Sequence, residues 1–272
     1  GGAGRPLQEH GMAGAALVAV ILAEAAGLRD SLLASIDVHE PPNAIAVVYA
    51  LLLSADGELR ERQLEYLDKQ AQPAVVAALP AARQAVAQLA GERKLPLVDL
   101  CLPALRQLSK PQYEAFRANL EHLIESDRQI DLFEFCLKSI VERRLDQYHR
   151  ESPPPQSRIR SAQAARAEIQ LLLSALTHLS GSSAPEETFA TAAGMINAPG
   201  AEWRLQPLDE CGVDAIERAL GTLSGAMPMV KKNLLYACGQ LVMEDRHVTR
   251  SEMQLLRAVA ELLETPIPPF VN

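Results

Sequence analysis

Apolar residues in this chain recur at the spacing of an α-helix. In the segment 161–179 the apolar stripe falls at Ala164, Ile169, Leu172, Leu173, Leu176 and Leu179. Positions about 3.6 residues apart lie on one face of a helix, so this segment is expected to bury one side against its neighbours. No stretch of the sequence alternates β-branched or aromatic residues with polar ones over the length of a strand. The pattern predicts an all-α fold, a helical bundle.

Capping residues and prolines predict where the helices begin and end. Asn43 is expected to cap a helix over 46–53, and Ser109 one over 112–125. Pro80 is expected to interrupt its helix, because proline lacks the N–H that a helix interior needs. Other helical segments are expected at 74–89, 97–102, 214–224, 230–243 and 251–263.

The composition excludes several classes of protein. Of 272 residues, 48% are apolar, which excludes a chain that is disordered throughout. Only 4% are aromatic, and 26 basic against 34 acidic residues give a formal net charge of −8. A nucleic-acid binder places basic residues on phosphates and aromatic rings on bases, so no nucleic-acid partner is expected. The length suits one large domain or two small ones.

The cysteines indicate the redox state of the protein's compartment, and the apolar runs indicate whether the chain crosses a membrane. The four cysteines are widely spaced, without a C-x-x-C pair: Cys101, Cys136, Cys211 and Cys238. They are expected to be buried thiols, as in a reducing compartment, although four cysteines could also form two disulfide bridges. The longest apolar run, 12–23, has twelve residues, whereas a helix needs about 20 to cross a bilayer. We therefore expect no membrane span in this chain.

The chain is expected to divide near residue 104. Residues 1–11 begin Gly-Gly-Ala-Gly-Arg-Pro and are expected to be a linker or tag remnant, which would make the chain a piece of something longer. Residues 12–104 are expected to form an N-terminal helical region. Residues 105–272 are expected to form a duplicated helical domain, with further helices inserted between its halves. Within it, the Pro-rich linker 151–157 is expected to be extended and solvated.

A helix–turn–helix pattern occurs twice at a constant offset of 118 residues. The first copy reads LIESDRQIDLFEF over 123–135, and the second reads LVMEDRHVTRSEM over 241–253. A weaker third copy, LLSADGELRERQL over 52–64, lies 71 residues before the first. In each copy one helix is expected to end, the chain to turn at an aspartate, and the next helix to begin. The two offsets differ, so a solenoid of regular period is not expected.

The acidic residues of the two stronger copies have two interpretations. In the first, Asp131 with Glu134 and Thr249 with Glu252 form capping boxes, in which each side chain accepts the other residue's main-chain N–H. In the second, carboxylates of these copies bind a divalent cation. The candidate metal ligands are Asp127, Asp131, Glu134, Asp245 and Glu252. An EF-hand is not expected, because the sixth loop position, a glycine in that motif, is Leu132 here.

At these residues the sequence resembles a TerB-like domain, the all-helical module named from tellurite-resistance proteins. That family carries two helix–(Asp-Gly-x-apolar-x-x-x-Glu)–helix units, roughly as here. The resemblance implies a divalent-metal-binding or stress-sensing module. Its acidic positions fall on Asp127, Glu134, Asp245 and Glu252. The family's glycine is replaced by Arg128 and Arg246 in the two stronger copies.

A second resemblance runs from about residue 12 to the end of the chain. Four segments resemble the C-terminal region of bacterial HtpX-like membrane zinc metallopeptidases. They are VYALLL at 48–53, LRQLSKPQY at 105–113, IDLFEFCL at 130–137 and LLRAVA at 255–260. In that family the protease domain, its zinc and its membrane helices precede this region. The resemblance implies that this chain is the soluble C-terminal part of such a protein. It also implies the cytoplasmic side of the bacterial inner membrane, with the upstream protease domain and other proteins as partners.

The chain itself carries no recognisable catalytic motif. A zinc protease of this class needs H-E-x-x-H on one helix. The segment HEPPN at 39–43 lacks the second histidine, and His122 has no histidine one turn away. We therefore expect no enzymatic activity and no cofactor in this chain, but a regulatory or protein-interaction function. The alternative is the metal-binding module that the TerB-like resemblance implies.

Overall fold

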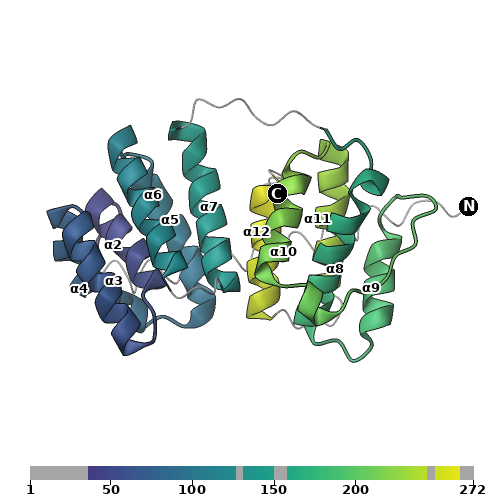
Figure 1. The fold of residues 1–272 in the computed structure, drawn as a ribbon, viewed down its shortest axis with the longest axis horizontal. Coiled ribbons are helices and arrows are strands. Elements are labelled where there is room, and N and C mark those ends of the chain that lie inside the picture. Colours follow the sequence, from purple (N-terminus) through teal and green to yellow (C-terminus); the bar gives the residue numbers. More distant parts are fainter. Residues whose placement is uncertain (1–35, 127–130, 150–157, 244–248, 264–272) are drawn as a thin grey trace, which may run out of the picture. The chain divides into compact units, whose positions relative to one another are not determined.

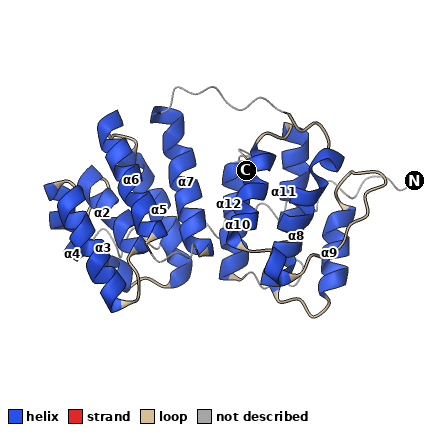
Figure 2. Ribbon diagram, viewed as in Figure 1, coloured by secondary structure: helices blue, strands red, loops and turns tan. Residues whose placement is uncertain are grey.

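The computed structural model describes residues 36–126, 131–149, 158–243 and 249–263. Across these ranges the regular structure is helical, with eleven α-helices, α2 to α12, and short 3-10 helices between them. One isolated bridge pairs Ile159 with Ala226, and the described ranges contain no longer strand (Figure 2). The predicted all-α fold is confirmed.

The chain divides into two compact units, with the division at 151/152. In the first unit lie α2 (Pro41–Leu52), α3 (Gly57–Gln70), α4 (Pro73–Ala87), α5 (Lys94–Leu105), α6 (Lys110–Glu125) and α7 (Leu132–His149). In the second lie α8 (Arg166–Ser180), α9 (Pro185–Gly194), α10 (Val213–Ser224), α11 (Pro228–Met243) and α12 (Arg250–Leu262) (Figure 1). Residue 104, near which a division was expected, lies inside the first unit, close to the loop between α5 and α6. Helices on the two sides of that loop pack together, α5 on α7 and α2 on α6.

Helix α2 is the centre of the first unit. It is buried from Ala44 to Leu52 and packs against α4, α5 and α6. A helix that is apolar on all sides is stable only when other helices surround it. The one polar side-chain group between Ala44 and Leu52 is the hydroxyl of Tyr49. It donates to the carbonyl oxygen of Phe116 at 3.3 Å and accepts from Asn119 Nδ2 at 3.2 Å.

Two predicted helix boundaries in the first unit are wrong. Pro80 lies inside α4 without ending it, on the exposed side, while Val75 and Leu79 pack inward. The buried face outweighs the hydrogen bond that proline removes. Asn43 does not cap α2, because the helix begins earlier, at Pro41, and Asn43 Nδ2 donates to the carbonyl oxygen of Asp37 at 2.9 Å.

Helix α8 is the centre of the second unit and packs against α9, α10, α11 and α12. Its buried face holds the predicted apolar residues Ile169, Leu172, Leu173 and Leu176. The helix ends at Gly181, whose φ of 62° is the left-handed conformation that glycine adopts without steric cost. After Gly194, which ends α9, the chain runs without regular structure through residue 207, and this loop frames the site described below.

All four cysteines are buried and none forms a disulfide bridge, which confirms the expected thiols and excludes the alternative of two bridges. Burial raises the pKa of Cys238 to about 12 and that of Cys101 further still. In the part of the chain that the structure describes, no helix is long and apolar enough to cross a membrane.

Candidate functional site

The first acidic turn forms the predicted capping box. Asp131 Oδ1 accepts the main-chain N–H of Glu134 at 2.8 Å, and Glu134 Oε2 accepts the N–H of Asp131 at 3.1 Å. These bonds satisfy two donors at the start of α7, which otherwise lack helical partners. The third candidate ligand of this turn, Asp127, lies outside the described residues.

The second turn forms a capping box of the same kind, but its glutamate is buried. Thr249 Oγ1 accepts the N–H of Glu252 at 3.2 Å, and Glu252 Oε2 accepts the N–H of Thr249 at 2.7 Å. Glu252 is fully buried, and its Oε1 has no hydrogen-bond partner. Asp245 lies outside the described residues. Among those that are described, no three His, Cys, Asp or Glu side chains are grouped as a metal site would require.

The weaker third copy folds differently from the other two. Asp56 caps α3 directly, accepting the N–H of Leu59 at 2.8 Å, so that the helix begins at the turn itself. Gln63, which matches Glu134 in the repeat, is buried. Its Nε2 donates to Ser126 Oγ at 2.8 Å, and its Oε1 accepts the N–H of Ser54 at 2.8 Å. Gln63 therefore joins the C-terminal ends of α2 and α6.

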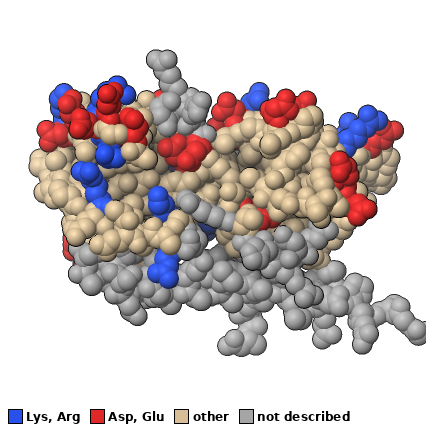
Figure 3. All heavy atoms as spheres, turned by 90° about the horizontal axis from the view of Figure 1, so that it is seen from below, with Lys and Arg blue, Asp and Glu red and all other residues tan. Residues whose placement is uncertain are grey.

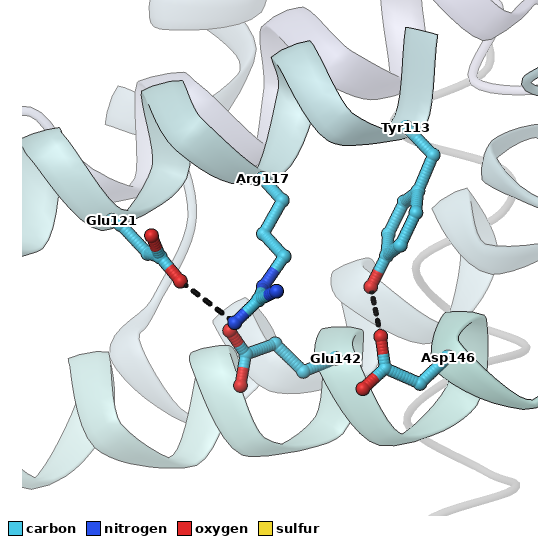
Figure 4. A network of polar contacts seen from close by, with 5 residues as sticks. All are labelled: Tyr113, Arg117, Glu121, Glu142 and Asp146. Carbon is cyan, nitrogen blue, oxygen red and sulfur yellow. Dashed lines mark hydrogen bonds and ion pairs between the residues drawn. The ribbon is translucent and has the colours of Figure 1, made fainter. Parts of the chain in front are cut away.

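A polar network joins α6 to α7 (Figure 4). The hydroxyl of Tyr113 donates to Asp146 Oδ1 at 2.5 Å. Arg117 Nε donates to Glu142 Oε1 at 3.1 Å, and its Nη2 pairs with Glu121 Oε1 at 2.9 Å. Burial, and then the hydrogen bond to Asp146, raise the pKa of Tyr113, so its hydroxyl stays protonated. This arrangement cross-links two helices and leaves no activated nucleophile.

The second unit contains a hollow of about 560 Å³. It is lined by His178 of α8, by Glu186, Phe189 and Ala190 of α9, and by residues 203–207. We call the segment 202–207 the strap; it belongs to the loop between α9 and α10 (Figure 1). A hollow of this size is within the range of about 300–1,000 Å³ found for ligand-binding clefts.

Two side chains of α8 hold the middle of the strap. Gln170 Oε1 accepts the main-chain N–H of Arg204 at 3.2 Å, and Ser174 Oγ accepts that of Gln206 at 3.0 Å. Four residues of helix advance by about 6 Å. Two residues of extended chain advance by about 6.6 Å. The strap is therefore extended and runs along α8 in register with it.

The same register continues at both ends of the strap. Arg166 Nη1 donates to the carbonyl oxygen of Glu202 at 2.8 Å. His178 Nε2 lies 2.7 Å from the carbonyl oxygen of Gln206, and it carries the hydrogen because a carbonyl oxygen only accepts. Every fourth residue of α8 from Arg166 to His178 thus contacts the strap's backbone.

One edge of the strap has free hydrogen-bonding groups. Within the described residues, the main-chain groups of Trp203 and Leu205 form no hydrogen bond. Gln206 Oε1 is buried and also has no partner. Trp203 and Leu205 are partly exposed, so their main-chain groups are available to a ligand that forms main-chain hydrogen bonds.

The surroundings of the hollow are acidic. The segments 185–190 and 202–210 together carry one guanidinium, Arg204, and five carboxylates: Glu186, Glu187, Glu202, Asp209 and Glu210. Burial, together with the negative charges of Glu210 and Asp209, raises the pKa of nearby Cys211 to about 11. On the face drawn in Figure 3, acidic and basic side chains of the described residues are interspersed, without one continuous basic surface.

Comparison with protein-family models, with curated proteins and with solved structures found no match for this chain. Sequence reasoning did not find the hollow or the strap. The available signal was a polar residue at every fourth position of the largely apolar segment 166–178. That spacing indicates a polar stripe on a buried helix but does not say which segment it binds.

Proposed function

We propose that this chain is a non-catalytic, regulatory protein-interaction domain. The observation that supports this proposal is the hollow in the second unit, which lies beside an extended strap with unpaired main-chain groups. The sequence resemblance supports the further proposal that the chain corresponds to the soluble C-terminal part of an HtpX-like membrane zinc metallopeptidase. In that proposal the zinc belongs to an upstream protease domain on the cytoplasmic side of the bacterial inner membrane.

The groups around the hollow favour binding over chemistry. His178, the residue best suited to proton transfer, has its Nε2 occupied by the carbonyl oxygen of Gln206. Glu186 and Arg204 are exposed to solvent rather than enclosed in the hollow. The remaining lining is largely apolar, as in a site that anchors an apolar side chain of a partner.

Site-specific photo-crosslinking in bacterial cells tests the interaction function. The photoreactive residue p-benzoylphenylalanine replaces Ala190, which is exposed and lines the hollow. In a control it replaces Ala81, which is exposed on α4 of the first unit. We expect discrete crosslinked proteins from position 190 that position 81 does not give. Identical patterns from both positions would contradict the proposal.

A casein assay tests the absence of catalysis. The purified chain is incubated with casein in the presence of zinc, and again with a chelator. We expect no cleavage in either case. Zinc-dependent cleavage by the chain would show that a catalytic centre exists in it.

A second function, binding of a divalent cation by the acidic turn before α12, is favoured by one observation. Glu252 Oε1 is buried without a partner, although a buried carboxylate oxygen normally has one. A bound cation would supply that partner. Calorimetry with calcium, zinc and manganese, on the chain and on Glu252→Gln, tests this function: binding tighter than about 1 mM that the variant loses supports it. Absence of such binding rejects it.

A further inference from the structure

We infer that the strap binds an extended peptide segment by strand addition, with apolar side chains of that peptide entering the hollow and basic residues flanking them. This inference rests on the proposed interaction function and names the chemistry of the partner. It is carried by the unpaired edge of the strap, the apolar lining of the hollow and the charge around it.

The hydrogen bonds of the strap show which edge is free. In an extended chain, alternate residues direct their main-chain N–H and C=O groups to opposite sides. Glu202, Arg204 and Gln206 direct theirs to α8. Trp203 and Leu205 therefore direct theirs away from α8. These two residues offer two donors and two acceptors in the spacing of a strand edge, which an added strand can pair.

The hollow beside this edge suits apolar side chains. Phe189 and Ala190 line it from α9, and Trp203, Leu205 and Pro207 line it from the strap. In a bound strand, residues two apart direct their side chains to the same face, about 6.6 Å from each other. The hollow thus selects the motif apolar-x-apolar.

The charge around the hollow favours particular residues in the peptide on either side of the apolar-x-apolar motif. Five carboxylates against two guanidinium groups, that of Arg204 and that of Arg166 at the end of the strap, leave a negative excess around the hollow. Peptides with lysine or arginine on either side of the apolar pair are attracted to such a surface, and acidic peptides are repelled. The effect is screened at high salt, since most of these carboxylates are exposed.

A selection from random nonapeptides displayed on phage, with the full chain as the target, tests the predicted motif. We expect enriched peptides to carry apolar-x-apolar with flanking basic residues. The most enriched peptide is then synthesised and its affinity measured by fluorescence anisotropy. Ala190→Leu, which places a larger side chain in the hollow, should weaken binding at least about tenfold, as expected when an anchor loses part of its pocket. The matched control Ala81→Leu should leave the affinity unchanged.

Methylation of the peptide's backbone nitrogens, one at a time, tests strand addition itself. N-methylation removes a donor and obstructs pairing, so binding should fall about tenfold or more at alternate positions and little at those between them. The double variant Glu186→Gln, Glu187→Gln should lower the affinity several-fold at low salt and reduce its salt dependence.

The outcomes separate this inference from the proposed function. Binding that depends on Ala190 but shows no two-residue alternation would overturn strand addition and leave the interaction function in place. Selection of acidic or proline-rich peptides, or of no peptide, while crosslinking at position 190 succeeds, would overturn the inference in the same way. Failure of both the selection and the crosslinking would overturn both.

Discussion

The main-chain N–H of Gln206 donates to Ser174 Oγ at 3.0 Å, and Ser174 is fully buried in the middle of α8. This contact is one of four that hold the strap on the central helix of the second unit, and it joins residues 32 positions apart. The strap forms one wall of the hollow. The geometry of the candidate site therefore depends in part on a buried serine of α8.

Removing that hydroxyl should loosen the strap. Ser174→Ala leaves the N–H of Gln206 without an acceptor, at a cost of about 1–3 kcal/mol. Trp203, the only tryptophan of the chain, lies in the strap and reports the unfolding of the second unit by fluorescence in urea. Hydrogen exchange of the strap amides should also accelerate. Thr222→Ala, which removes a hydroxyl bonded only within its own helix, is the control and should change neither measurement.

The α6–α7 network should stabilise the first unit in a pH-dependent manner. Tyr113→Phe removes the bond to Asp146 and should cost about 1–3 kcal/mol, as for a hydrogen bond to a charged group. Burial and Asp146 raise the pKa of Tyr113 above its ordinary value of 10.0. The stabilisation is therefore complete below about pH 10 and is lost as the pH rises toward the raised value.

Hydrogen exchange of α6 and α7 between pH 8 and 11 measures this effect after correction for intrinsic exchange rates. The first unit should lose protection above pH 10, and Tyr113→Phe should lose less. Tyr148→Phe is the matched control, since Tyr148 lies on α7 with 56% of its surface exposed. Equal loss of protection in both variants would contradict the role of Tyr113.

Making the weakest repeat more like the other two should destabilise the protein. Gln63→Glu introduces the residue type of Glu134, but the new carboxylate replaces an amide donor that faces the carbonyl oxygen of Leu123. Negative charge is unfavourable at the C-terminal ends of helices, where carbonyl oxygens are exposed. We expect a loss of about 2 kcal/mol or more in the free energy of unfolding of the first unit. Gln84→Glu, exposed on α4, should be close to neutral in the same thermal or urea unfolding experiment.

Cys211 should be the first thiol to react in the folded chain. It is 7% exposed, whereas Cys101, Cys136 and Cys238 are fully buried. Its pKa of about 11 means that its thiolate fraction, and hence its rate of alkylation by iodoacetamide, should rise about tenfold from pH 8 to pH 9. Asp209→Asn with Glu210→Gln removes the two charges that help to raise this pKa and should speed labelling several-fold at pH 8. Mass spectrometry of the labelled peptides measures both rates, and an unchanged rate in the double variant would contradict the electrostatic contribution.

The features that could be predicted from sequence depend on residues close together along the chain. The capping boxes of Asp131 with Glu134 and of Thr249 with Glu252 join residues three apart, so their bonds follow from the local order of residues. The apolar face of α8 follows from helical spacing in the same way. These local rules predict the all-α class and several helix ends without any tertiary contact.

Local rules failed where tertiary packing outweighed them. Pro80 breaks a helix in isolation, yet α4 continues through it because the opposite face is buried against α2. Gln63 occupies the position of a capping glutamate in the repeat, but its partners Leu123 and Ser126 lie about 60 residues away. No pattern within 52–64 indicates those partners.

By itself, the sequence determined that this protein is helical, where most of its helices lie and that its thiols belong in the core, because each of these depends on local spacing and hydrophobicity. Only the tertiary structure decided that the strap lies on α8. The four contacts that hold it join residues 28 to 36 positions apart, and each partner alone is an ordinary polar group. The hollow exists because these four hydrogen bonds form together and hold the strap on α8. The order of residues along the chain does not specify that pairing.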